Sequence, residues 1–505
     1  MTLVGRTRPG QGPASKGVSF LLQPPTAVYL ARAIDLTTSS PSHIQGSTVR
    51  SRSSTASLNL RCFASSMLNV LVVGAGIAGL SAAVSLRRAG HYVHVYERSA
   101  LNNEIGAAIN VPPNATRFLL AWGLDPVRWR FVTSRGIRYL DPFTLEPLRN
   151  VVPPKGGPRA FGGTDLFYAH RVDLHNALKW LATKEDGPGA PVTIHLSTHV
   201  VAYDSSKPSI FLQGGQEITG DIVIAADGVH SLASDVILGR KNFPVPPVHS
   251  NSCYRFLIPA AALEEDPDTR FWVEDCNGWA RLVPHGPTKR RIVSYPCRNN
   301  TIFNFVGVFY DKNMDSGGAE NWQASVDISQ VLDRYSDFHP KLLGVIRKAK
   351  EAKRYPLLYR HPLPTMCKGR MALAGDAAHP MLPHHGQGGA QGLEDGLAIG
   401  IVLHGASSPS EIEKRLGIYD QVRCKRASAI QILSNAGLEQ FDLVQHELRQ
   451  YLEPDKIPRS MQDTYKFNFG FDIVRATLKA MQDHNPAFRL PADFFECEVV
   501  GVPGQ

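Results

Sequence analysis

Cysteine is scarce in this chain, and the few cysteines are not spaced for metal or redox chemistry. Seven occur among 505 residues, and no two of them form a C-x-x-C pair. This pattern excludes the common zinc-binding spacings and a thioredoxin-like motif, and the odd number argues against a disulfide framework. We therefore expect no metal site and reduced intracellular thiols at Cys62, Cys253, Cys276, Cys297, Cys367, Cys424 and Cys497.

Long apolar runs are lacking as well. No segment reaches the roughly 18 consecutive apolar residues that a membrane-spanning helix requires. Hydrophobic residues make up 43% of the chain and charged residues 20%, which is typical of a soluble globular enzyme. Because 505 residues exceed one ordinary hydrophobic core, the sequence predicts at least two domains, and the reduced thiols favour a cytoplasmic location.

Acidic residues are nearly missing from residues 1–66, where Asp35 stands among many Ser, Thr, Arg and Pro residues. This composition is typical of a disordered arm or of a transit peptide, and the latter would direct the protein to mitochondria. A third interpretation is that the functional chain begins at Met67. The segment holds seven of the 54 Lys and Arg residues, so much of the net charge of +9 lies in it. The nearly neutral remainder offers no basic stripe for nucleic acid, and its small positive excess suits anionic cofactors and substrates.

What the chain does contain is a glycine-rich turn between an expected strand and an expected helix. Gly74, Gly76 and Gly79 form a G-x-G-x-x-G. An apolar run at 68–73 precedes it, and helical periodicity over 78–89 follows it. Gly74 would allow a tight turn, Gly76 the approach of a pyrophosphate to the backbone, and Gly79 close packing of helix and strand. The segment predicts a βαβ unit that binds a dinucleotide at the N-terminus of its helix.

An acidic residue closes the second strand of this unit. The strand is expected at 92–96, and Glu97 lies 18 residues after Gly79, close to the spacing at which a carboxylate binds a ribose hydroxyl. With strand, turn, helix, strand and acid in order, an ordinary surface turn is a poor alternative. No second strand-linked G-x-G-x-x-G occurs in the chain, so a dedicated nicotinamide domain is not expected.

Two further motifs make the chain resemble a known enzyme family. Residues 226–231 form a D-G motif, and residues 375–380 form a G-D motif that continues through 383–396. Together with the glycine turn, they resemble the motifs of single-component FAD-dependent aromatic hydroxylases, in particular the fungal salicylate-hydroxylase-like branch. The resemblance extends from Met67 to about residue 436.

The resemblance implies an α/β fold with a Rossmann-like FAD-binding domain, an inserted mixed β-sheet substrate domain and C-terminal helices. We expect the FAD-binding domain at 67–250 and 356–405. The substrate domain is expected at 251–355, where aromatic residues and strand formers are frequent, and the helical region at 406–505.

One departure from the family concerns NAD(P)H. The family usually carries an arginine soon after the D-G motif, but Leu232 and Ala233 occupy this place here. The docking of NAD(P)H, and the choice between NADH and NADPH, therefore stay open.

The resemblance also implies roles for residues around FAD. Asp376 would accept a hydrogen bond from a ribityl hydroxyl, although a carboxylate there can also cap a turn. Gly389 belongs to a loop whose N–H groups begin a helix beside the flavin, where the positive helix end would stabilise the anionic reduced cofactor. Arg171 would reach the phosphates or the ribityl chain, and Ala108 lies in a further matching segment that would contact FAD. Asp227 would serve both FAD and the pyridine nucleotide, or else simply end a turn after a strand.

By resemblance, NAD(P)H reduces FAD, O2 forms a hydroperoxide at the flavin C4a carbon, and one oxygen atom passes to an electron-rich ring. Arg255 and Tyr295 resemble the active-site pair of the fungal branch. Arg255 would hold a phenolate or carboxylate, and Tyr295 would hydrogen-bond the substrate oxygen. Their structural alternatives are a salt-bridged surface arginine and a core tyrosine. His384 and His385 lie near the expected flavin and are interpreted as loop packing groups rather than as bases or metal ligands.

The sequence thus predicts an FAD- and NAD(P)H-dependent monooxygenase that hydroxylates a small phenolic or aromatic-acid substrate with O2. A flavoprotein of the same fold that epoxidises or oxidises its substrate stays open as an alternative. A non-catalytic flavin-binding redox sensor is a second alternative.

Overall fold

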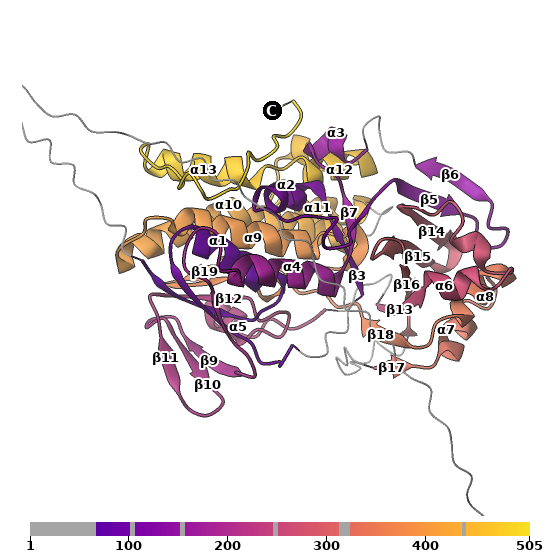
Figure 1. Ribbon diagram of the computed structural model, residues 1–505, viewed down its shortest axis with the longest axis horizontal. Coiled ribbons are helices and arrows are strands. Elements are labelled where there is room, and N and C mark those ends of the chain that lie inside the picture. The colour runs from indigo at the N-terminus through magenta and orange to yellow at the C-terminus, as the bar shows by residue number, and fades with distance from the viewer. Residues whose placement is uncertain are drawn as a thin grey trace, which may run out of the picture. The chain divides into compact units, whose positions relative to one another are not determined.

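The computed structural model in Figure 1 shows how the elements of the chain are arranged. The residues that it describes all lie in one compact unit, Phe63–Gln505. The interpretations of residues 1–66 as a disordered arm, a transit peptide or an upstream extension fall outside them. The described residues are 67–101, 107–151, 157–245, 251–312, 324–436 and 441–504.

The first layer is a six-stranded sheet built around the expected βαβ unit. Its strand order is β19-β20-β12-β1-β2-β8, and β1 is parallel to both β2 and β12. The side chains from Val70 to Val73 are all buried, as expected for a strand that is covered on both faces. The order of strand, helix and strand predicted from the glycine turn is confirmed. The strands are β1 (Asn69–Val73), β2 (Tyr92–Tyr96), β8 (Thr193–His195), β12 (Ile222–Ala225), β19 (Cys367–Lys368) and β20 (Met371–Leu373).

Two helices that are far apart in the sequence, α1 (Ile77–Arg88) and α9 (Gly388–Leu403), pack closely through small residues. A Cβ atom at Gly396 would lie 2.4 Å from the backbone nitrogen of Ala82, and one at Gly400 would lie 2.0 Å from Oγ of Ser85. The Ser85 hydroxyl also donates a hydrogen bond to a carbonyl of α9 at 3.1 Å. Because the contacts advance in the same direction along both helices, α1 and α9 are parallel and begin side by side.

The second layer is an eight-stranded sheet in the order β17-β18-β13-β16-β15-β14-β5-β6. Two of its strands, β5 and β6, come from much earlier in the sequence than the expected substrate segment 251–355. They join because β14 pairs with β5 in parallel, a long-range contact that no local pattern encodes. The strands are β5 (Gly136–Leu140), β6 (Pro147–Val151), β13 (Ser252–Pro259), β14 (Trp279–His285), β15 (Arg290–Cys297), β16 (Ile302–Phe309), β17 (Ser325–Val326) and β18 (Ala352–Pro356).

Helices cover one face of the second sheet, as Figure 1 shows for α6, α7 and α8. Trp272, Phe305 and Tyr335 are fully buried in the core between them. Alternate residues of the strands point to the opposite face, which is left for the cavity described below. The helices are α6 (Ala260–Glu264), α7 (Ile328–Arg334) and α8 (Pro340–Arg347).

A three-stranded sheet, in the order β3-β7-β4, meets the second sheet at Ala108. Tyr295 donates its hydroxyl to the carbonyl of Ala108 at 3.0 Å. The backbone N–H of Ala108 donates to Oδ1 of Asn304 at 3.2 Å. The backbone N–H and the carbonyl of Ala108 are therefore both hydrogen-bonded to side chains of the second sheet. The strands are β3 (Ala108–Val111), β4 (Val132–Thr133) and β7 (Phe167–His170), and a separate three-stranded sheet contains β9 (Val200–Asp204), β10 (Ser209–Leu212) and β11 (Glu217–Thr219).

Helices follow at the C-terminal end. The described part of α10 ends at Ala436, and the next described elements are a 3-10 turn at Phe441–Val444 and then α11. Within the described ranges, no helix is long and apolar enough to cross a membrane. The remaining helices are α2 (Pro113–Ala121), α3 (Arg159–Gly162), α4 (Arg171–Thr183), α5 (Leu232–Leu238), α10 (Pro409–Ala436), α11 (Gln445–Leu448), α12 (Met461–Phe469) and α13 (Ile473–His484).

Candidate active site

The glycine turn has a conformation that depends on its glycines. Gly74 has a φ of +97°, and a Cβ atom there would lie 2.4 Å from the carbonyl oxygen of Ala226. A Cβ atom at Gly79 would lie 1.9 Å from the carbonyl oxygen of Gly74. At Gly76, by contrast, a Cβ atom would meet no protein atom within 4 Å. Gly76 borders open space at the start of α1, whose first turn has neither an acidic side chain nor a side-chain cap, so the site fits a pyrophosphate.

Glu97 lies at the mouth of this turn, directly after β2. Its Oε2 atom accepts a hydrogen bond from the backbone N–H of Ala75, and its Oε1 atom accepts one from Ser99, both at 2.8 Å. Each carboxylate oxygen can accept two hydrogen bonds, so Glu97 keeps acceptor capacity for ribose hydroxyls. The carbonyl of Ala75 lies 2.7 Å from Nε2 of His175 in α4, a contact that the sequence did not indicate.

Asp376 of the G-D motif follows β20 and lines a cavity. The turn is close to α1, because a Cβ atom at Gly375 would lie 2.7 Å from Cβ of Ala78. Among the described residues, none donates a hydrogen bond to the Asp376 carboxylate, so it is not used as a turn cap. Desolvation raises the pKa of this carboxyl, and the charges of His379 and Arg171 oppose the rise. An acceptor that is open to the cavity fits a ribityl hydroxyl.

A buried carboxylate in α9 holds this turn from behind. Asp395 accepts hydrogen bonds from the backbone N–H of Gly375 at 2.8 Å and from Nε2 of His379 at 2.6 Å. Its other oxygen accepts one from Arg423 of α10 at 2.7 Å. Burial alone would raise the pKa of Asp395, but His379 and Arg423 lower it to about 2. The turn that carries Asp376 is therefore held in place by hydrogen bonds to the ionised Asp395 carboxylate.

A second carboxylate, Glu394, extends this network. It pairs with Arg423 and accepts two hydrogen bonds of 2.8 Å from Arg426. Asn114 of α2 donates to it at 2.6 Å. The side chains of Glu394, Asp395 and Arg423 are 0% exposed. The apolar spacing of α10 favours a packing role, and no local sequence pattern indicates that Arg423 and Arg426 neutralise two buried carboxylates.

The first residues of α9 and the loop before it lie against β3, with little room for side chains. A Cβ atom at Gly389 would lie 2.6 Å from Cδ1 of Ile109, and one at Gly386 would lie 2.7 Å from Nδ2 of Asn110. The first turn of α9 has neither an acidic side chain nor a side-chain cap. Its N–H groups can therefore bind an anionic ligand edge, as predicted for the flavin ring.

One cavity of about 540 Å³ brings together predicted residues from different parts of the fold. Asp376, Gly389 and Ala108 line its first side, and Arg255 and Tyr295 line the side formed by the second sheet. Apolar side chains complete the second side, namely Leu282, Val293, Val306 and Val308.

Arg255 projects from the apolar part of this wall. Its strand register places it beside Val306, which in turn pairs with Val293. Nε of Arg255 is buried and has no hydrogen-bond partner within the described part of the chain. The guanidinium carbon lies 5.8 Å from the ring centre of Tyr355. Because a buried donor without a partner costs free energy, Arg255 is placed to bind an oxygen atom of a ligand.

Tyr295 lines the cavity, but its proton is already used. Its hydroxyl donates to the carbonyl of Ala108, and the side chain is buried among apolar groups. Burial raises the pKa of Tyr295 to about 12, although the charge of Arg255 opposes this rise. The Tyr295 oxygen can therefore accept a hydrogen bond from a ligand but has no second proton to donate.

Six of the predicted cofactor-binding residues do not line the cavity, namely Gly74, Gly76, Gly79 and Glu97 at the glycine turn, and Arg171 and Asp227. Arg171 is the first residue of α4 and acts electrostatically on Asp376. Asp227 lies two residues after β12, beside the glycine turn, and its Oδ2 atom accepts a hydrogen bond from the Tyr203 hydroxyl at 2.6 Å. Burial raises the pKa of Asp227. The carboxyl group of Asp227 is thus directed to Tyr203, while its backbone lies close to Gly74.

The histidines of the loop before α9 also line the cavity. Nδ1 of His384 lies 2.6 Å from Nη2 of Arg291 on β15 and accepts its hydrogen bond. Desolvation and the positive charge of Arg291 hold the pKa of His384 well below its ordinary value. His384 is therefore neutral, and its Nδ1 atom is not available as a base. In the part of the chain that the structure describes, no group of three His, Cys, Asp or Glu residues could hold a metal ion.

The sequence analysis did not single out Ser134, Tyr168 or Arg291, which also line the cavity. Tyr168 lies on β7, which ends at His170, directly before the predicted Arg171. Tyr168 and His170 point to the same face of this strand, so strand periodicity could have indicated that Tyr168 lies near the site. Ser134 and Arg291 carry no comparable signal.

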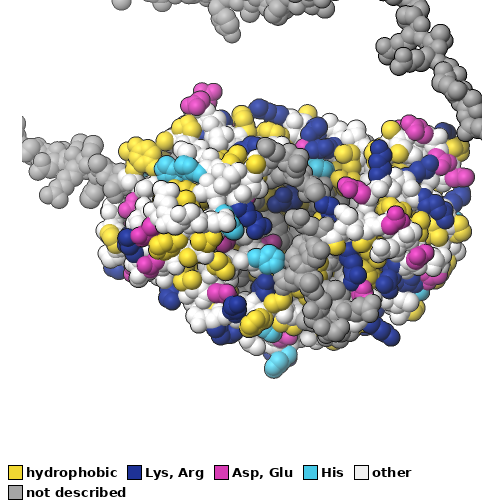
Figure 2. All heavy atoms as spheres, turned by 90° about the horizontal axis from the view of Figure 1, so that it is seen from below, with side chains coloured by type: hydrophobic (Ala, Val, Ile, Leu, Met, Phe, Trp, Pro, Cys, Tyr) yellow, Lys and Arg dark blue, Asp and Glu magenta, His cyan; other side chains and the backbone are white. Residues whose placement is uncertain are grey.

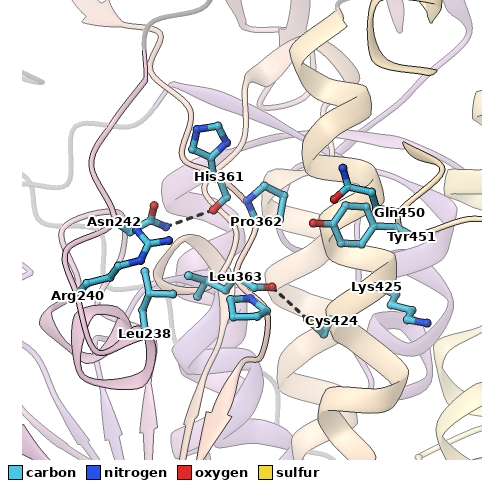
Figure 3. A pocket seen from close by; sticks show the side chains of 11 residues that line it. Leu238, Arg240, Asn242, His361, Pro362, Leu363, Cys424, Lys425, Gln450 and Tyr451 are labelled. Carbon is cyan, nitrogen blue, oxygen red and sulfur yellow. Dashed lines mark hydrogen bonds between the residues drawn. The ribbon is translucent and has the colours of Figure 1, made fainter. Parts of the chain in front are cut away.

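A second hollow of about 440 Å³ shares no lining residue with this cavity (Figure 3). Arg240 and Asn242 lie on one side of it, and Cys424 lies on another. The Asn242 side chain donates a hydrogen bond to the carbonyl of His361 at 3.3 Å, which joins two of the segments that line the hollow. None of the cofactor-binding or catalytic residues predicted from the sequence lines this hollow, so we do not include it in the active site.

The surface charge is mixed on the face shown in Figure 2. Basic, acidic and apolar side chains are interspersed over this face, and Lys, Arg and His side chains border the hollow at its centre. A local positive field at a hollow favours the approach of anionic ligands.

Known proteins that are similar to this chain include FAD-dependent enzymes. The FAD binding domain family matches residues 190–433, and the NAD(P)-binding Rossmann-like domain family matches residues 72–107. Over 429 residues, the chain is 50% identical to the FAD-dependent monooxygenase cfoG of Aspergillus candidus, which covers 85% of this chain and 98% of that protein. It is 30% identical over 371 residues to 3-hydroxybenzoate 6-hydroxylase 1 of Aquipseudomonas alcaligenes, with 72% and 87% covered. A solved salicylate hydroxylase substrate complex has the same fold, with a TM-score of 0.61, 23% identity and coverage of 85% of this chain and 99% of that chain.

Proposed function

Because the chain belongs to the FAD-dependent monooxygenases of the aromatic hydroxylase type, we propose that it uses NAD(P)H and O2 to hydroxylate a small phenol or aromatic acid. The first sheet and its helices would bind FAD, and the second sheet would bind the substrate. Bound FAD supplies the redox chemistry of such a reaction, by taking hydride from NAD(P)H and activating O2.

The residues around the glycine turn and the G-D motif fit FAD. The open space at Gly76 would take the pyrophosphate, and Glu97 would accept the ribose hydroxyls. Asp376 would accept a ribityl hydroxyl, and the N–H groups that begin α9 near Gly389 would hold the edge of the flavin ring.

The observation that carries the proposed substrate class is the buried Nε atom of Arg255, which has no partner among the described residues. A phenolate or carboxylate oxygen would satisfy this donor by a charge-assisted hydrogen bond. A phenolate is a better nucleophile than a phenol, so its stabilisation by Arg255 would favour attack by the ring. The valines beside Arg255 would contact the ring carbons and exclude water.

Tyr295 would act as an acceptor, because its own proton is bound to Ala108. A hydroxyl of the substrate could donate to the Tyr295 oxygen. This role differs from that of a base, since the raised pKa keeps the phenol protonated.

The proposal is tested with purified protein that begins at Met67 and with a panel of salicylates, hydroxybenzoates and resorcinols. NAD(P)H oxidation should depend on an aromatic compound, and with ¹⁸O₂ the product should gain one labelled oxygen atom. A product that has lost hydrogen without gaining the label would indicate an oxidase and would contradict the proposal.

A further inference from the structure

Tyr168 lies in the cavity next to Tyr295 but uses its hydroxyl group differently. It lies on β7, the central strand of the three-stranded sheet, where it pairs with Asn110 and Val132. Its side chain is 4% exposed, and its ring centre lies 4.9 Å from that of Tyr295. Both rings line the cavity that also contains Arg255. The two phenols can therefore reach the same ligand.

The hydrogen bonds distinguish the two hydroxyl groups. Tyr295 donates its proton to Ala108. Tyr168 instead accepts a hydrogen bond from Oγ of Ser134 at 2.8 Å. Its own proton has no acceptor within the ranges that the structure describes, and no other polar contact of Tyr168 is present there. Tyr168 thus has a free donor where Tyr295 has a free acceptor.

Two features keep this donor available. Ser134 accepts the backbone N–H of Gly136 at 3.3 Å, so a chain of donors runs from Gly136 through Ser134 to Tyr168. Such chains polarise the last hydroxyl and strengthen its donation. Burial also raises the pKa of Tyr168, so the phenol stays protonated at neutral pH.

We propose that Tyr168 donates a hydrogen bond to an oxygen substituent of the substrate, and that the substrate is an aromatic compound with two oxygen substituents. One substituent is anionic and binds Arg255, and the other accepts the proton of Tyr168. This inference rests on the proposed function and narrows its substrate class. It also assigns Tyr168, rather than Tyr295, as the neutral donor of the site.

The test compares Tyr168→Phe with the unaltered protein by ligand titration of the flavin absorbance. The compounds with two oxygen substituents are salicylate, 3-hydroxybenzoate, 4-hydroxybenzoate and resorcinol, and those with one are benzoate and phenol. We expect Tyr168→Phe to weaken binding of at least one two-oxygen compound by about tenfold, the usual effect of one lost hydrogen bond. Binding of benzoate and phenol should change by less than about twofold, because these ligands lack the second oxygen substituent that would accept the hydrogen bond of Tyr168.

The controls separate substrate binding from structure. Tyr168→Phe keeps the ring and should retain FAD content and Tm. Ser134→Ala removes the donor that orients Tyr168 and should give a smaller loss with the same dependence on the ligand. An equal loss for both ligand classes, a loss of FAD, or no loss at all would overturn the inference.

The inference and the proposed function fail in different ways. If the unaltered protein inserts oxygen into a panel compound and Tyr168→Phe does so with unchanged kcat and KM, the Tyr168 assignment alone is wrong. If the unaltered protein binds none of the compounds, or inserts no oxygen into any of them, both are wrong.

Discussion

Nε2 of His379 lies 2.6 Å from Oδ2 of Asp395, and this contact joins the turn that carries Asp376 to helix α9. The same carboxylate oxygen accepts the N–H of Gly375, while the other binds Arg423. A carboxylate with three donors, fully shielded from water, holds its neighbours in one geometry as long as it stays ionised. The position of the predicted ribityl contact is thus fixed by charge inside the protein.

This arrangement predicts that the protein loses stability in acid over a defined pH range. The pKa of Asp395 is lowered from 3.8 to about 2, and that of Glu394 is lowered as well. Because the unfolded carboxyl groups take up protons first, the stabilisation is complete above about pH 5 and is lost as the pH falls toward about 2. Urea unfolding measured between pH 5 and pH 2 should show a steep fall in the free energy of unfolding. A free energy that is constant over this range would contradict the assignment.

Asp395→Asn is the matched variant. It should lower the free energy of unfolding at pH 7 by about 3 to 5 kcal/mol, because a buried charged partner stays uncompensated. It should also flatten the acid dependence. Asp483→Asn removes a carboxylate from an exposed pair with Lys479 and should change neither quantity measurably.

Valine should have different effects at two glycines of the glycine turn, with loss of FAD at one and loss of stability at the other. Gly76→Val should fold with unchanged apoprotein stability but purify without the yellow FAD colour, because its side chain would fill only the space for the pyrophosphate. Gly74→Val should lower the stability of the protein, because φ is +97° and Cβ would lie 2.4 Å from a carbonyl oxygen. Absorbance at the flavin bands and thermal unfolding measure the two effects. Native flavin content in Gly76→Val would show that the cofactor position is misplaced.

Arg255→Ala should separate cofactor binding from substrate turnover. The variant should keep its FAD, because Arg255 lies on the wall formed by the second sheet, but should lose roughly 100-fold in kcat/KM, the effect of one charged hydrogen bond. Arg255→Lys should recover part of the loss by supplying charge without the same geometry. Arg240→Ala, which removes an exposed arginine of the second hollow, is the control and should turn over normally. Normal turnover by Arg255→Ala would refute its assignment.

Glycine to alanine changes in α9 and α10 should have opposite signs. Gly396→Ala should lower the free energy of unfolding by about 1 to 3 kcal/mol, because Cβ would lie 2.4 Å from the backbone of α1. Gly417→Ala, at an exposed position of α10 with no atom within 4 Å, should raise it by about 0.5 to 1 kcal/mol. Both values come from urea unfolding of the same preparation. A stable Gly396→Ala variant would mean that α1 and α9 can separate without cost.

The sequence predicted those parts of the fold whose signals are local. The βαβ unit follows from an apolar run, a glycine turn and helical periodicity that are adjacent in the chain, and α9 follows from the glycine-rich loop before it. The membership of β5 and β6 in the second sheet could not be predicted, since it depends on a parallel pairing with β14.

The same distinction applies to the site. Residues such as Asp376, Gly389 and Arg255 could be named from motifs, and they line one cavity. Their hydrogen-bond partners could not be named, because a donor or acceptor on another element leaves no mark in the local pattern. The proton of Tyr295 is the clearest case, since the sequence suggested a bond to substrate and the structure shows a bond to Ala108.

At Ala108, the junction between the three-stranded sheet and the second sheet does not depend on the side chain of the residue that forms it. Both of its bonds use the peptide backbone, so changing its side chain leaves them in place unless proline removes the N–H. The junction is instead controlled by Tyr295 and Asn304, 187 and 196 residues further along the chain. Variation at position 108 can therefore reshape the cavity without loosening the joint, whereas variation at either distant residue alters how firmly the two halves of the cavity are held together.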